Sequence, residues 1–183
     1  MLSDFPILKT SRLILRAIHI SDAQLVHRNL SDYQTIIYSN TVEPPSLEKV
    51  QKMIEKWQQG FTKQQVIRWG ITIKGEDAII GSCGYKKIIK NHRRAEIGYE
   101  IFAEYRRQGI ISEALNAIIQ FGFKVIELTL IEATVNCNNL ASISLLNKLG
   151  FIEEGVLREY EFQQDKFTDL KLFSLRQKDL YNV

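Results

Sequence analysis

The chain contains few of the residue types on which several classes of protein depend. Its 183 residues include two cysteines, three histidines and three prolines, and 24 basic side chains are nearly balanced by 21 acidic ones. Two cysteines are too few for a disulfide framework, and neither forms a metal-binding spacing with the histidines. The interspersed charges lack the concentrated basic face of a nucleic-acid binder. We therefore expect neither a bound metal nor a nucleic-acid partner.

Long apolar runs are also absent. No run approaches the roughly 20 residues of a membrane-spanning helix, and residues 1–6 lack the basic region and apolar core of a signal peptide. We expect a cytoplasmic protein that does not enter a membrane. Hydrophobic residues make up 45% of the chain, enough for one core, and no repeat or linker interrupts it. These features predict one domain that covers residues 1–183.

Strand and helix patterns follow one another along this domain. Apolar and β-branched segments predict strands at 13–17, 66–73, 78–88, 95–103 and 128–135, with a final hairpin after residue 151. Capping residues and apolar spacings of three and four predict helices from Ser21, from near Ser46, after Gly109 and at 139–149. This order indicates one mixed α/β (α+β) sheet domain flanked by helices. The segment 33–45 is polar and aromatic without a period, and is a candidate substrate loop.

A basic turn containing Gly109 connects the predicted strand 95–103 directly to a helix pattern. The first amide N–H groups of a helix have no partner inside the helix and favour an anion in front of them. An ordinary turn that needs glycine only for its backbone angles is the alternative. The anion-binding interpretation assigns a site to Arg106, Arg107, Gln108, Gly109, Ile110, Ile111 and Ser112.

The turn resembles a motif of the GNAT superfamily of N-acetyltransferases. Arg106-x-x-Gly109 is similar to the start of the family signature Arg/Gln-x-x-Gly-x-Gly/Ala, which grips the pyrophosphate of acetyl-CoA, whereas Ile111 stands where Gly or Ala is usual. Thr10 to Arg16, followed by Asp22, resembles the opening of the branch that acetylates ribosomal-protein N-termini.

A second motif lies on the predicted helix that ends at Gly150-Phe151. Asn138 or Asn139 is suited to the N-cap, and Gly150 to the left-handed residue after the helix. Asn139-x-x-Ser142 and Gly150-Phe151 also match the family helix that lines the coenzyme arm.

The resemblance implies a fold and a co-substrate. It implies a twisted, mostly antiparallel sheet whose fourth and fifth strands run parallel and splay apart around the pantetheine arm of acetyl-CoA. Backbone amides at Ile101, Phe102 and Ala103 would bind that arm, with Asn139 and Ser142 beside it. Family members occur as monomers or homodimers, and both states stay open.

Candidate catalytic residues lie on the predicted fourth strand. Strand alternation puts Glu96 and Glu100 on one face, where either is a candidate base for an ammonium group. The alternative is that both carboxylates are structural. By resemblance Ser142 contacts the sulfur end of the coenzyme. The family position for a tyrosine that protonates the thiolate holds Leu146, which has no proton to donate, so that role stays open.

The acceptor is the least defined part. Four aromatic residues are candidates for an acceptor cleft: Tyr38, Trp69, Tyr99 and Tyr160. The resemblance favours a primary amine at a protein N-terminus, of the ribosomal-protein type. The alternatives are a small amine, such as a polyamine, an amino acid or an antibiotic, and a non-catalytic acyl-CoA-binding module.

Overall fold

The computed structural model describes residues 2–37, 43–163 and 165–181, and in this part of the chain eight strands form one sheet. The strand order is β1-β2-β3-β4-β5-β6-β8-β7. Every neighbouring pair is antiparallel except β5 and β6, which are parallel. The strands are β1 (Leu8–Lys9), β2 (Leu13–Ala17), β3 (Ile67–Ile73), β4 (Ile79–Ile89), β5 (Arg94–Ile101), β6 (Leu130–Asn136), β7 (Ile152–Gln163) and β8 (Lys166–Arg176).

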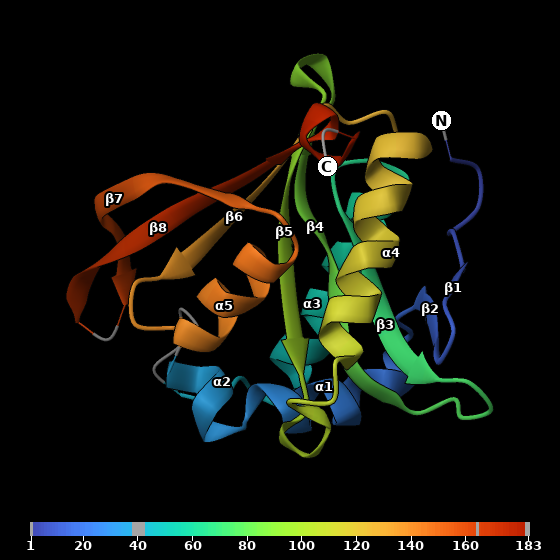
Figure 1. The fold of residues 1–183 in the computed structure, drawn as a ribbon. Coiled ribbons are helices and arrows are strands. Elements are labelled where there is room, and N and C mark those ends of the chain that lie inside the picture. The colour runs from blue at the N-terminus through green and yellow to red at the C-terminus, as the bar shows by residue number, and fades with distance from the viewer. Residues whose placement is uncertain (1, 38–42, 164, 182–183) are drawn as a thin grey trace.

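Helices cover both faces of the sheet (Figure 1). The helices α4 (Ile110–Lys124) and α5 (Leu140–Lys148) lie on the face toward the viewer. On the other face, α1 (Ala23–Leu30) contacts β4 and α3 (Leu47–Thr62) contacts β3. The short α2 (Tyr33–Ile37) follows α1, and short 3-10 turns lie at η1 (Ile20–Asp22), η2 (Lys90–His92), η3 (Ala103–Tyr105) and η4 (Gln177–Tyr181). The predicted mixed α/β domain with a parallel pair in a mostly antiparallel sheet is confirmed.

The predicted substrate loop 33–45 is partly helical. Its first residues form α2, and residues 38–42 lie outside the described part of the chain. The start of α3 agrees with the prediction, because the Ser46 hydroxyl accepts a hydrogen bond of 3.3 Å from the Lys49 amide.

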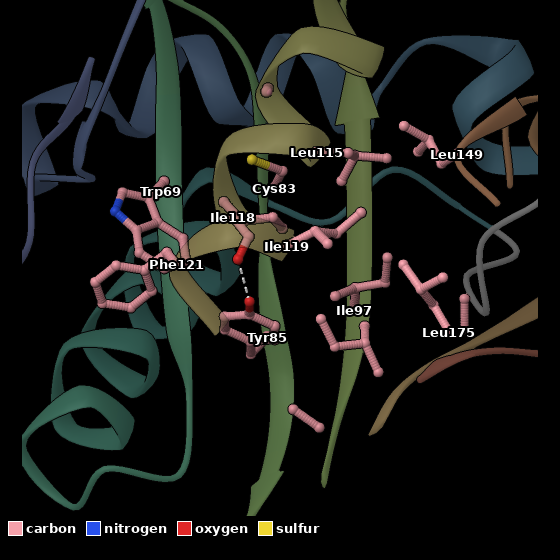
Figure 2. Close-up of a cluster of buried hydrophobic side chains, with 14 of the residues drawn as sticks. Trp69, Cys83, Tyr85, Ile97, Leu115, Ile118, Ile119, Phe121, Leu149 and Leu175 are labelled. Carbon is pink, nitrogen blue, oxygen red and sulfur yellow. Dashed lines mark hydrogen bonds between the residues drawn. The ribbon is translucent and has the colours of Figure 1, made fainter. Parts of the chain in front are cut away.

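The helix α4 is fixed to the sheet through aromatic residues in the main core. The ring of Trp69 packs edge-on against Tyr85 and Phe121, with centroids 6.1 and 5.5 Å apart. The Tyr85 hydroxyl donates to the backbone carbonyl of Ile118 (Figure 2). One turn later, a Cβ on Gly122 would lie 2.2 Å from the Tyr85 hydroxyl oxygen. The missing side chain therefore allows this contact and fixes the position of α4 against β4.

The parallel ladder between β5 and β6 is short. Its residue pairs are Arg94 with Leu130, Ala95 with Ile131 and Glu96 with Glu132. Beyond Glu96 the strands separate, and Figure 1 shows them diverging from the top of the view downward with α5 in front. We call the two unpaired edges, residues 97–101 of β5 and 133–136 of β6, the strand gap. The splay that the resemblance implied is present.

The Tyr85–Gly122 contact yields a test of the core. Gly122→Ala normally stabilises a helix by about 1 kcal/mol, but here the added methyl group meets the Tyr85 hydroxyl, so we expect a net destabilisation of about 1–3 kcal/mol. Tyr85→Phe alone should cost about 1 kcal/mol. Because it removes the clashing oxygen, the double variant should be more stable than the sum of the single effects predicts. Urea unfolding measures this coupling, and strictly additive energies would contradict the proposed contact.

Candidate functional site

The strand gap exposes hydrogen-bonding groups of β5. The Phe102 amide donates to the Ile80 carbonyl at 2.9 Å, so Phe102 and Ile80 form a hydrogen-bonded pair that continues the ladder between β5 and β4. Bonded and non-bonded pairs alternate along an antiparallel ladder, so Ile101, opposite Gly81, and Tyr99, opposite Cys83, direct their N–H and C=O groups away from β4 and into the gap. An extended chain inserted there would find partners on β5.

This register corrects part of the prediction for the coenzyme arm. Of the three amides expected to bind it, the Phe102 amide is occupied by the Ile80 carbonyl, and Ala103 opens the turn η3 instead of extending the strand. The Ile101 amide keeps the predicted orientation. The backbone of Tyr99, two residues before Ile101 and therefore with the same orientation, was not among the predicted groups.

The turn before α4 has the geometry of an anion site. Arg107 and Gly109 both adopt left-handed backbone angles, with φ values of 61° and 74°. Within the described part of the chain, the amide N–H groups of residues 107–112 donate no hydrogen bond to the protein. They lie at the positive end of α4, where the helix dipole favours an anion. The site is therefore built from backbone donors.

Two side chains predicted to bind the anion hold the turn in place instead. The Arg106 guanidinium donates to Asp32 at 2.6 Å and to the Thr35 hydroxyl at 3.3 Å, at the junction of α1 and α2. The Gln108 amide group donates to the Glu104 carbonyl at 2.8 Å. Burial opposes ionisation of Asp32, but hydrogen bonds from Arg106 and Thr35 outweigh it and hold the Asp32 pKa below its usual range.

Glu113, in the first turn of α4, anchors the segment that precedes β2. Its carboxylate accepts hydrogen bonds from the Thr10 and Ser11 hydroxyls at 2.6 and 2.9 Å, and from the Arg12 amide and Nε at 2.9 and 2.6 Å. Burial acts against the charged form, but these bonds lower the Glu113 pKa to about 2. Arg12 Nη1 also reaches the Gln108 carbonyl at 3.1 Å. The start of the Thr10 to Arg16 motif thus positions the anion site.

The end of the same motif holds β2 to α1. Arg16 makes two hydrogen bonds of 2.9 Å to the carboxylate of Asp22, which is 7% exposed. This parallel pairing is the strong geometry of guanidinium and carboxylate. Arg16 and Asp22 are therefore structural.

A surface depression of about 560 Å³ opens beside the anion site. It lies between β1, α4 and the end of α5, and its lining includes Gly109, Ser112, Asn116 and the two lysines Lys9 and Lys148. An anion bound at residues 107–112 has room to continue into this depression as a larger molecule.

Glu96 and Glu100 share one face of β5, as predicted, and each is paired with a cation. Glu96 lies 2.8 Å from Lys86 Nζ and accepts a hydrogen bond of 2.6 Å from the Thr134 hydroxyl. Glu100 is bound by the guanidinium of the buried Arg68 and by the Ser82 hydroxyl. Neither carboxylate is a free base in this arrangement.

Ser142 and Tyr99 meet on the opposite face. The Asn139 side chain caps α5 by accepting from the Ser142 amide at 3.1 Å, which confirms the predicted cap. The Ser142 hydroxyl oxygen lies 2.5 Å from the Tyr99 hydroxyl oxygen. Burial raises the Tyr99 pKa to about 12, although the bond to Ser142 opposes that shift. This pair links β5 to α5.

The other candidate acceptor residues scatter. Trp69 is fully buried and its ring N–H donates to the Pro6 carbonyl at 2.7 Å, so the prediction that it lines a cleft is wrong. Helices cover both faces of β3, and nearly all of its residues are buried. The alternation of side chains along this strand therefore could not show that Trp69 is buried. Tyr160 is 59% exposed on β7, and Tyr38 lies outside the described residues. Leu146 is buried in the core.

Among the described residues, no three His, Cys, Asp or Glu side chains gather in a way that could hold a metal ion. None of the helices in this part of the chain is long and apolar enough to cross a membrane.

Comparison with known proteins gives consistent matches. The family described as the acetyltransferase (GNAT) domain matches residues 12–152. The uncharacterized N-acetyltransferase YoaA of Bacillus subtilis is 38% identical over 93% of this chain and 97% of its own. The ribosomal-protein-serine acetyltransferase of Escherichia coli is 31% identical over 72% of this chain and 70% of its own.

The chain is also similar to a polyamine acetyltransferase and to a solved complex with coenzyme A. The spermidine N(1)-acetyltransferase of Vibrio cholerae is 26% identical over 94% of this chain and 97% of its own. The solved complex of the ribosomal L7/L12 α-N-protein acetyltransferase RimL with coenzyme A has a TM-score of 0.85 at 18% identity, and covers 93% of this chain and 98% of that one. This likeness supports the fold.

The lowered pKa of Glu113 predicts a pH-dependent contribution to stability. Because the folded pKa is depressed, the contribution is present above about 4.5 and is lost as the pH falls toward about 2. Glu113→Gln should therefore cost about 1 kcal/mol at pH 7, after allowance for solvent screening. That cost should shrink toward zero near pH 2. Urea unfolding from pH 7 to pH 2 measures it.

Glu48→Gln is the matched control, since Glu48 forms an exposed pair with Lys52 within α3. Its effect should be small at every pH. Equal pH dependence in both variants would contradict the role given to Glu113.

Proposed function

The chain belongs to the GNAT family of acetyltransferases and is an N-acetyltransferase, and we propose that it transfers the acetyl group of acetyl-CoA to the α-amine of a protein N-terminus, of the ribosomal-protein type. The observation that carries the choice of acceptor is the pairing of Glu96 with Lys86 and of Glu100 with Arg68. Each carboxylate already binds a cation of the protein in place of a substrate ammonium group, so these residues suit an amine that is already partly neutral.

The acceptor's own pKa then decides which amines react. An α-amine has a pKa near 7.7–8.0, and about a tenth of it is neutral at pH 7. An alkyl amine like that of lysine, with a pKa near 10.4, is neutral in only about one molecule in 2,500. An enzyme whose candidate bases already bind cations therefore favours the α-amine.

Coenzyme binding follows from three neighbouring features. The amides of residues 107–112 would hold the pyrophosphate, and the depression with Lys9 and Lys148 would receive the nucleotide. The pantetheine arm would lie along Tyr99 and Ile101 as an added strand. An amide on this edge would also polarise the thioester carbonyl.

Acetyl transfer then proceeds by direct attack. The neutral amine adds to the carbonyl carbon, the developing oxyanion is stabilised by the backbone amide, and the carbon–sulfur bond breaks. We propose that Glu96, which lies at the closed end of the strand gap, accepts the amine's proton through water. Glu100 has a positioning role, because it neutralises the buried Arg68.

A small amine is the second candidate acceptor. The similarity to a spermidine acetyltransferase extends over more of this chain than the similarity to the ribosomal-protein-serine enzyme does. A polyamine needs several unpaired acids, however, and Glu96, Glu100, Glu132 and Glu153 are each paired with a cation. This pairing supports the peptide.

The anion site is tested with Gly109→Ala. Alanine disfavours the backbone angle of residue 109, and the cost of about 1–2 kcal/mol falls on the loop that presents the amides. We expect acetyl-CoA to bind at least tenfold more weakly, as measured by calorimetry.

Gly75→Ala is the control. Gly75 has a φ of 89° and open space around it, so it carries a similar backbone strain in the turn between β3 and β4. It should keep normal affinity. Equal affinity in both folded variants would refute the anion site.

The acceptor is tested by comparing kcat/KM at pH 7 for peptides starting with Ser or Ala against spermidine and aminoglycosides. We expect the peptides to be at least tenfold better. In the same assay, Glu96→Gln should lower kcat/KM by about a hundredfold, with a smaller deficit at high pH where amines deprotonate unaided. Small amines that react as efficiently as every peptide would overturn the acceptor assignment and leave the coenzyme site standing.

A further inference from the structure

We infer that the Tyr99 hydroxyl donates a hydrogen bond to the coenzyme sulfur as the thiolate leaves, and that Ser142 positions it. This inference rests on the proposed acetyl transfer and assigns the role that Leu146 cannot fill. Leu146 lies on the same helix as Ser142 but is fully buried among apolar side chains.

The location of Tyr99 follows from the register of β5. The coenzyme arm would start at the anion site, which follows the C-terminal end of β5. It would pass Ile101 first and Tyr99 next, and it could go no deeper than Glu96, where β5 and β6 pair. The reacting end of the arm therefore lies beside Tyr99.

The side chain of Tyr99 points toward the helices that enclose this arm. Its hydroxyl oxygen lies 2.5 Å from that of Ser142 in the first turn of α5. The Ser142 amide is fixed by the Asn139 cap. The two hydroxyls thus connect β5 to the helix α5, and each keeps further hydrogen-bonding capacity for a ligand.

No carboxylate of β5 competes for this position. Glu96 and Glu100 project from the opposite face of the strand, where they bind Lys86 and Arg68. Arg68 in turn lies under the ring of Trp57 on α3, at 5.5 Å from its centroid. Donors for the leaving group on the other face are the hydroxyls of Tyr99 and Ser142.

The charge on Tyr99 does not change during the proposed reaction. The amine nitrogen forms a bond to the carbonyl carbon, and the sulfur leaves with the electron pair of the broken carbon–sulfur bond. Tyr99 donates its O–H to the sulfur and accepts from Ser142, while the amine's proton passes through water to Glu96. Burial raises the Tyr99 pKa to about 12, above a thiol's usual value of about 8.5. Tyr99 therefore stays a phenol and acts as a hydrogen-bond donor.

The test measures the pKa of the thiol of bound coenzyme A, from the ultraviolet absorbance of the thiolate. A donor at the sulfur stabilises the thiolate, so we expect a pKa below that of free coenzyme A for the wild-type chain. Tyr99→Phe should raise it and lower kcat by about tenfold or more, while the affinity for acetyl-CoA changes less than about threefold. Ser142→Ala should act in the same direction with a smaller effect.

Tyr85→Phe is the matched control. It removes a buried tyrosine hydroxyl from β4 that bonds only within the core, and should leave the thiol pKa unchanged. An unshifted thiol pKa in the wild-type chain, or equal values in wild type, Tyr99→Phe and Ser142→Ala, would overturn this inference alone. Failure of the wild-type chain to bind coenzyme A would overturn the proposed function as well.

Discussion

The structure depends on the early separation of two parallel strands. β5 and β6 pair over three residues, and each then runs on with one edge unpaired. Unpaired backbone groups are costly unless water or a ligand satisfies them. Each strand is nevertheless held along its other edge. β8 pairs with the whole length of β6, and β4 pairs with the whole length of β5. The sheet thus stays intact while one backbone edge of each strand is left for another partner.

Polar contacts from distant segments hold the surroundings of this gap. Glu113 ties the first turn of α4 to residues 10–12, and Arg106 ties the turn before α4 to Asp32. The contacts from Glu113 to Thr10 and from Arg106 to Asp32 join residues that are 103 and 74 positions apart. Because they use side chains, they leave the amides of residues 107–112 free for an anion. The side chains that make the sequence motif recognisable therefore hold the turn, and the binding role that we propose falls to its backbone amides.

The sequence predicted local elements better than contacts between them. The caps at Ser46 and Asn139 and the helix start after Gly109 depend on nearby residues, and all three are present. The parallel pair was implied by resemblance, because periodicity does not reveal strand order. Trp69 was predicted to line a cleft and Arg106 to bind the coenzyme, but Trp69 is buried and Arg106 binds Asp32. Burial and ion pairing depend on which helix covers a strand, and the sequence alone does not show that. Only the register of β4 and β5 distinguishes the Phe102 amide from that of Ile101.

Side-chain alternation along β5 divides the proposed reaction between two faces. Glu96 and Glu100 project toward one face, together with the cations that they bind, and Tyr99 projects toward the other with Ser142. The backbone between them faces the gap. In the proposed reaction, the amine would approach the carbonyl carbon from the carboxylate face. The thiolate would leave toward the hydroxyl face. One strand therefore separates the groups that handle the nucleophile from those that handle the leaving group, and a one-residue shift in register would exchange them.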